Sequence, residues 1–96
     1  MEFDKTVNGK TTTVKAIGKL DSVGAPEFTQ AMDGIANGMD AVVLDFAGVS
    51  YISSAGLRSV LKLVMGAGKS TKISIVNADG MTAEVFKTAG FGSLLS

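Results

Sequence analysis

The sequence predicts an α/β fold in which a mixed β-sheet carries its helices mainly on one face. The short, nearly continuous apolar runs at residues 41–46 and 72–76 are typical of strands buried on both faces. Segments with apolar residues at helical spacing separate these runs, and strands joined through helical crossovers are parallel. An Asn8-Gly9 pair between two further strand-like runs indicates an antiparallel hairpin at the N-terminus.

The hairpin strands are expected at residues 3–7 and 11–17, because Asn-Gly tolerates the two positive φ angles of a type I′ turn. Ala25-Pro26-Glu27 predicts a helix start, with Pro at the first position and an acid in the first turn. Apolar residues then follow on one helical face: Phe28, Ala31, Met32 and Ile35. Asn37-Gly38 is expected to end this helix.

The second helix follows the strand at 41–46, and Leu57, Val60, Leu61 and Val64 form its apolar face. Either Ser53 or Ser54 can cap its N-terminus. After the strand at 72–76, a third helix is expected from Asp79-Gly80 to about residue 89. Gly90 is expected to end it, with Phe91 packing back on the last turn.

Composition limits the chemistry that this chain can perform. Its 96 residues fit one domain, spanning residues 1–96. With no Cys and no His, thiolate nucleophiles, Cys-based metal sites and the commonest general base are excluded. We therefore expect no enzyme, no cofactor and no metal site. No apolar run is long enough to span a bilayer and no secretory signal is present, so we expect a cytoplasmic protein.

Charge is balanced overall but not along the chain. Nine basic residues match nine acidic ones, which argues against nucleic-acid binding by bulk charge and against a polybasic membrane surface. Residues 46–78 nevertheless contain no acid and four basic residues: Arg58, Lys62, Lys69 and Lys72. A solvated helix face accounts for this pattern. The alternative is that Arg58 and Lys62 steer docking onto an acidic partner.

The segment from Tyr51 to Arg58 places two adjacent hydroxyls where a strand meets a helix. A serine nucleophile needs a base, and Arg58 stays protonated, so serine catalysis is not expected. A phosphate on Ser54 would meet free N–H groups, the positive end of the helix dipole and Arg58 one turn along. Ala55 and Gly56 would leave room for a modifying enzyme. A plain N-cap explains the same serines, and the two roles are compatible.

The run from Gly66 to Ser70, GAGKS, is similar to the end of a phosphate-binding loop. Such a loop needs an earlier glycine where this chain has Leu63, and it lies between a strand and a following helix. Here a helix ends and a strand begins. We expect a helix C-terminal turn.

Four segments of this sequence resemble STAS domains of bacterial anti-sigma factor antagonists. They are the run VVLDFAGVSYISSAGLRSVL, GKLD at 18–21, APEF at 25–28 and FKTAGF at 86–91. The resemblance covers nearly the whole chain in the right order and implies a STAS-like single domain. It implies a non-enzymatic switch that, unphosphorylated, binds an anti-sigma factor that is also a serine kinase and so frees the sigma factor. Phosphorylation would release that kinase, and a phosphatase would reset the switch.

The resemblance places the phosphoacceptor at Ser54 and an acid beside it at Asp21, which could equally be a turn residue. Ser53 stands where many antagonists have an acid, and Ala55 where many have Ser or Thr, so Ser53 remains an alternative acceptor. The expected partner-binding residues are Asp21, Ser53, Ser54, Ala55, Gly56, Leu57, Arg58 and Lys62.

Two further expectations come from the same resemblance and from the end of the sequence. The chain ends at Leu94-Leu95-Ser96, so the family's closing strand and last helix are expected to be short or absent. STAS-like domains also serve as fixed subunits of lipid or anion transport assemblies, in which the serine would be only a cap. Nothing in the sequence indicates an obligate oligomer, and we expect a monomer.

Overall fold

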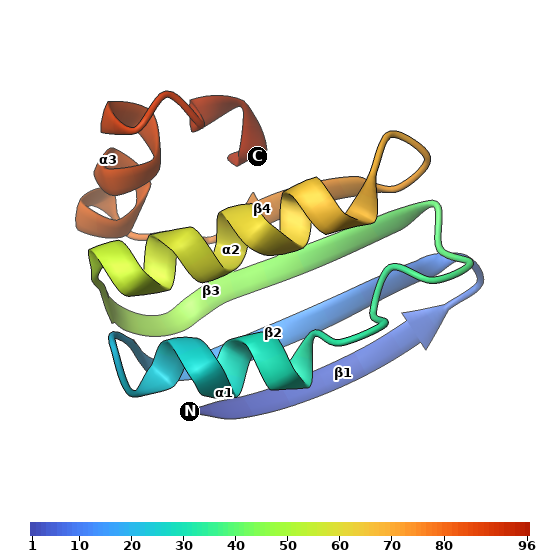
Figure 1. The fold of residues 1–96 in the computed structure, drawn as a ribbon, viewed down its shortest axis with the longest axis horizontal. Helices are drawn as coiled ribbons and strands as arrows, with labels where there is room; N and C mark the ends of the chain where they lie inside the picture. The colour runs from blue at the N-terminus through green and yellow to red at the C-terminus, as the bar shows by residue number, and fades with distance from the viewer.

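A computed structural model describes all 96 residues. After the N-terminal hairpin of two strands, three helices alternate with two further strands (Figure 1). Their bounds are β1 Glu2–Asn8, β2 Thr11–Leu20, α1 Gly24–Ala31, β3 Ala41–Ile52, α2 Ser54–Ala67, β4 Lys72–Val76 and α3 Gly80–Thr88, followed by a short 3-10 turn, η1, at Gly92–Leu94.

The sheet has the strand order β1-β2-β3-β4, with β1 antiparallel to β2 and the other neighbours parallel. Buried and more exposed residues alternate along β2, the first half of β3 and β4, so one face of the sheet is covered and the strands at 41–46 and 72–76 are not fully buried on both faces as expected. Helices α1 and α2 run side by side along the sheet, and α3 lies beyond the N-terminal end of α2 (Figure 1). The predicted fold class is confirmed.

The hairpin forms where the Asn-Gly pair predicts it. Gly9 has a φ of 61°, and Asn8 pairs with Thr11 across the turn. Strand β2 continues to Leu20, three residues beyond the expected end, because its second half pairs with an equally extended β3.

Strand β3 runs to Ile52 rather than ending at Phe46 as expected. Two register shifts against β2 give β3 two extra residues, so its buried positions past Phe46 are spaced by three, at Val49 and Ile52. These β-bulges break the period-two pattern that marks a strand in a sequence. The extension carries the chain directly to the two serines.

Helix α1 is shorter than predicted, ending at Ala31 instead of continuing to Asn37. Beyond Met32 the backbone forms successive turns, and Gly34 adopts a φ of 71°, which a helix cannot contain. Ile35 nonetheless packs against the core, so its apolar character reflects burial and not helix. The shortened helix leaves open space against α2.

The core lies between the sheet and the helices. Phe28 of α1, Phe46 of β3 and Phe86 of α3 are fully buried. Phe86 holds α3 against β3, with its ring centroid 6.4 Å from that of Phe46. Helix α3 ends as predicted, because Gly90 (φ 86°) donates to Lys87 and Phe91 N–H donates to the Phe86 carbonyl in a Schellman motif.

The last residues of the sequence add one bridging residue to the sheet, beside β4. Leu95 forms a single parallel bridge with Ile75, and the Ser96 N–H donates to the Ile75 carbonyl at 2.8 Å. The closing strand is therefore reduced to one bridging residue.

Asp79 caps α3, and this contact predicts an acid-dependent loss of stability. Its Oδ1 accepts the Thr82 N–H at 2.7 Å, and this bond lowers the pKa of the carboxyl below 3.8. A depressed native pKa gives stability that is present above the unfolded pKa and is lost as the pH falls through the native one. In thermal unfolding, Asp79→Asn should keep the cap but flatten the profile below about pH 4, whereas Asp79→Ala should lower the midpoint by several degrees at neutral pH. Identical acid profiles for all three proteins would contradict this role.

Candidate functional site

The candidate site lies where the parallel strands end. Asp21 follows the last residue of β2, Ser53 follows β3, and Asp79 comes three residues after β4. The carboxyl ends of parallel strands share one edge of the sheet, which is where α/β proteins place their binding sites. Leu20 pairs with Ile52, and the Ser53 N–H donates to the Leu20 carbonyl at 3.0 Å, so the first two loops are in contact.

The two serines at this edge have different environments. Ser53 is the N-cap of α2, with an extended backbone (φ −101°, ψ 176°) and an Oγ that accepts the Gly56 N–H at 3.3 Å. Ser54 is the first residue of the helix. It is exposed, and its hydroxyl forms no hydrogen bond within the chain. The structural cap and the accessible hydroxyl are thus separate residues.

Gly56 does not provide the open space that its small size suggested. It is buried beneath the end of β2, and a Cβ at this position would overlap the carbonyl oxygen of Leu20. A Cβ at Gly24, at the start of α1, would likewise overlap the carbonyl oxygen of Lys19. Both glycines allow a helix to begin in contact with the end of β2, so the role of Gly56 is close packing.

The neighbours of Gly56 lie on two sides of α2. Ala55 lines a groove between α2 and α1, whereas Leu57 lines a different groove between α2 and α3. The predicted partner-binding residues on α2 therefore share one end of the helix but do not form one continuous face.

Asp21 lies at the same edge but is engaged elsewhere. Its Oδ1 accepts the N–H groups of Gly24 at 2.8 Å and Val23 at 3.0 Å, which holds the loop that begins α1. These bonds, that of Gly24 first, lower the pKa of the Asp21 carboxyl, so it carries its charge at neutral pH. Its structural role is that of a turn residue, beside the site.

The basic segment is divided in space. Arg58 and Lys62 are exposed on α2 and line the groove toward α1, while Lys69 and Lys72 lie past the other end of this 14-residue helix. Helix α2 contains no acidic residue, and neither Arg58 nor Lys62 takes part in an ion pair. Positive charge therefore accompanies the helix dipole at the end that carries Ser54.

Three large apolar side chains are exposed around this edge: Val23 (73%), Tyr51 (49%) and Met81 (81%). Tyr51 and Met81 line one small cavity, and Met81 also lines the groove beside Leu57. Large apolar side chains exposed at one edge of a sheet are typical of a protein-docking surface. Sequence reasoning missed Val23 and Met81. An apolar residue within the turn sequence DSVG was the available signal for Val23.

No group of acidic side chains gathers to hold a metal ion. None of the helices has the length and apolar character needed to cross a lipid bilayer. The run GAGKS lies where α2 ends, at Ala67 and the Gly68 C-cap (φ 71°), as expected for a helix C-terminal turn.

The family model described as "Mlab, STAS domain" matches residues 3–96. This chain belongs to the STAS domain family. No curated protein has a sequence that matches this STAS domain significantly.

Solved structures share its fold at low sequence identity. An anti-sigma factor antagonist from Mycobacterium paratuberculosis superimposes with a TM-score of 0.86 at 23% identity, covering 98% of this STAS domain and 81% of that chain. The Bacillus cell fate determinant SpoIIAA in its phosphorylated form gives 0.74 at 18% identity, covering 99% and 89%. A sulfate transporter family protein from Wolinella succinogenes gives 0.78 at 14% identity, covering 95% and 80%. The fold thus occurs both in anti-sigma factor antagonists and in a sulfate transporter family protein.

Proposed function

We propose that this STAS domain is an anti-sigma factor antagonist whose partner binding is switched by phosphorylation of Ser54. In the unphosphorylated state it binds an anti-sigma factor that is also a serine kinase and so frees the sigma factor. The observation that carries the proposal is the division of roles between the serines: Ser53 forms the cap, and Ser54 presents a free, exposed hydroxyl. One neighbouring structure, SpoIIAA, is described in a phosphorylated form, which supports the same chemistry on this fold.

The surroundings of Ser54 suit a surface that docks when neutral. Val23, Tyr51 and Met81 supply apolar contacts, and Arg58 supplies a cation free of intramolecular pairing. A phosphate would add a charge of about −1.5 to −2 at the edge of this surface. Docking would then bury an anion against a partner surface that formed around a hydroxyl, and an unpaired buried charge costs several kcal/mol.

The test is phosphorylation by the cognate kinase with ATP, followed by mass mapping of residues 50–58. We expect one phosphate, on Ser54, and none in Ser54→Ala. Ser53→Ala should still be phosphorylated, although the loss of its cap makes α2 less stable. A phosphate on Ser53 would show that Ser53, and not Ser54, is the acceptor. Phosphate on neither serine would overturn the proposal of a phosphorylation switch.

A second candidate function is that of a fixed subunit in a transport assembly. The likeness to a sulfate transporter family protein favours it. In that case the Ser53 cap would be the only role of the serine pair. Partner capture separates the two, because a fixed subunit would bind its assembly equally well with Ser54 as Ser, Ala or Asp.

Steering by the cations on α2 predicts salt-dependent association with the kinase. Arg58 and Lys62 have no acidic neighbour on their helix, so their field reaches an approaching acidic surface. The association rate should fall as salt rises, and the double variant Arg58→Gln/Lys62→Gln should associate about tenfold more slowly at low salt. Lys69→Gln, at the far end of α2, should leave the rate unchanged. Stopped-flow measurement of a salt-independent rate would remove the steering role.

A further inference from the structure

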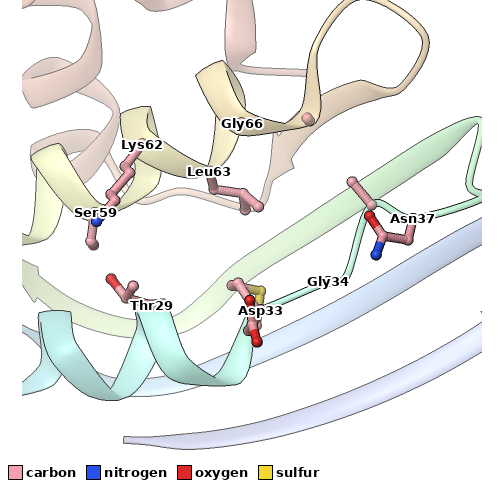
Figure 2. Close-up of a pocket in the computed structure, with 11 residues that line it drawn as sticks. Thr29, Asp33, Gly34, Asn37, Ser59, Lys62, Leu63 and Gly66 are labelled. Atoms are coloured by element: carbon pink, nitrogen blue, oxygen red, sulfur yellow. The ribbon is translucent and has the colours of Figure 1, made fainter.

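The region between α1 and α2 contains a cleft that the proposed switch does not use. One cavity of about 240 Å³ lies between the second half of α2 and the turns after α1, and a second, more open one of about 480 Å³ lies toward the N-terminal end of α2. The two share three lining residues, Thr29, Ser59 and Lys62, and so form one continuous cleft. Figure 2 shows the residues that line the first of them.

The cleft exists because small residues face each other and α1 ends early. Thr29 of α1 lies opposite Ser59 of α2, and Gly66 lines the cleft farther along α2, toward its C-terminal end (Figure 2). Below Gly66 the chain has left the helix, since Gly34 turns the backbone away at a φ of 71°. A continuous α1 with larger side chains would fill this space.

The cleft contains two cations and one anion, and none of them takes part in an ion pair. Lys62 and Asp33 both line the 240 Å³ cavity, yet the chain's ion pair is the one between the N-terminal amine and Glu27. Figure 2 shows Lys62, Ser59 and Thr29 grouped at one end, with Asp33 and Asn37 lying farther along the cleft. Arg58 extends the positive end, because it lines the adjoining cavity with Lys62 and no acid.

The remainder of the lining suits a compact, partly apolar molecule. Four apolar side chains contribute to it: Met32, Ala36, Leu63 and Ala67. Thr29 supplies a free hydroxyl at the positive end, whereas the hydroxyl of Ser59, which is more than nine-tenths buried, already donates to the Gly56 carbonyl at 2.6 Å. Cavities for drug-sized ligands are usually about 300–1,000 Å³, so 240 Å³ favours something smaller.

From these features we infer that the α1–α2 cleft binds a free amino acid. The ligand carboxylate lies toward Lys62 and Arg58, its ammonium group lies toward Asp33 and Asn37, and an apolar side chain contacts Met32 and Leu63. A molecule that carries both charges on adjacent groups can pair with Lys62 and with Asp33, whereas a simple anion or cation can pair with only one of them.

The test is an NMR titration of the full chain with an equimolar pool of the twenty amino acids, followed by the separate members. We expect saturable shifts of the backbone amides of Gly34, Ser59 and Gly66, with a Kd of about 1 mM or tighter for the best ligand. For L-leucine, the matched half-ligands are 4-methylpentanoate, which lacks the ammonium group, and 3-methylbutylamine, which lacks the carboxylate. Each half-ligand should bind at least tenfold more weakly than the amino acid.

Variants locate the two charges. Lys62→Gln and Asp33→Asn should each weaken binding about tenfold, while Lys69→Gln and Asp40→Asn, which change charges outside the cleft, should not. No saturable shift with the pool, or half-ligands that bind as tightly as the amino acid, would overturn the proposal. Because this titration needs neither kinase nor phosphate, its failure and a failure of the Ser54 switch are independent results.

Discussion

Ser54→Asp should bind the partner kinase more than a hundredfold more weakly than the unmodified protein. The exposed Ser54 hydroxyl lies at the edge of the sheet that also carries the exposed Val23, Tyr51 and Met81, so a carboxylate there must lose its water when the partner docks. A loss of about 3 kcal/mol corresponds to a factor of more than a hundred in Kd. Isothermal titration calorimetry with the purified kinase domain measures this directly.

The controls use the neighbouring serine. Ser54→Ala should bind as the unmodified protein does, because the hydroxyl makes no hydrogen bond within the chain. Ser53→Asp places the same charge one residue earlier, where a carboxylate can replace Ser53 as the N-cap, so it should be tolerated far better. Equal affinities for Ser54→Asp and the unmodified protein would mean that the serine is not a switch.

Elements with a strong local pattern could be predicted from the sequence alone. Strand β4 has the predicted bounds. Helix α2 begins at the predicted serine pair, because the capping hydroxyl, the apolar stripe and the preceding strand all indicate the same starting point. The errors arose where tertiary pairing overrides the pattern. The bulges that extend β3 depend on its register with β2, and the turns after α1, with Gly34 at a φ of 71°, replace the helix that the spacing of Ile35 predicts.

The candidate site was predictable in its chemistry and less so in its geometry. The placement of Asp21, Ser53 and Ser54 at one edge of the sheet follows from the strand order, but which serine forms the cap depends on a single hydrogen bond to Gly56. The apolar rim could not be found from periodicity. Val23 lies just before α1, where no repeating pattern exists, and Met81 shares a helical spacing with Val85 that indicates a core face although Met81 is 81% exposed.

Gly56→Ala should destabilise the fold strongly, although alanine is the better helix former. An added Cβ would overlap the Leu20 carbonyl, so the first turn of α2 must move away from β2. Overpacking of this kind costs roughly 2–3 kcal/mol, which in a domain of this size lowers the thermal midpoint by about 10 °C or more. Differential scanning calorimetry of the purified variant gives both quantities.

Gly66→Ala is the matched control, since it makes the same change near the other end of the same helix. No atom lies within 4 Å of a Cβ at Gly66, so only the backbone entropy of glycine is removed, which should stabilise by about 0.5 kcal/mol. Opposite signs for the two substitutions would show that Gly56 is required for close approach to β2 and not for flexibility. If Gly56→Ala were neutral or stabilising, the start of α2 would have to be able to shift. The placement of Ser54 at a fixed point on the docking edge would then no longer follow from the contact with Leu20.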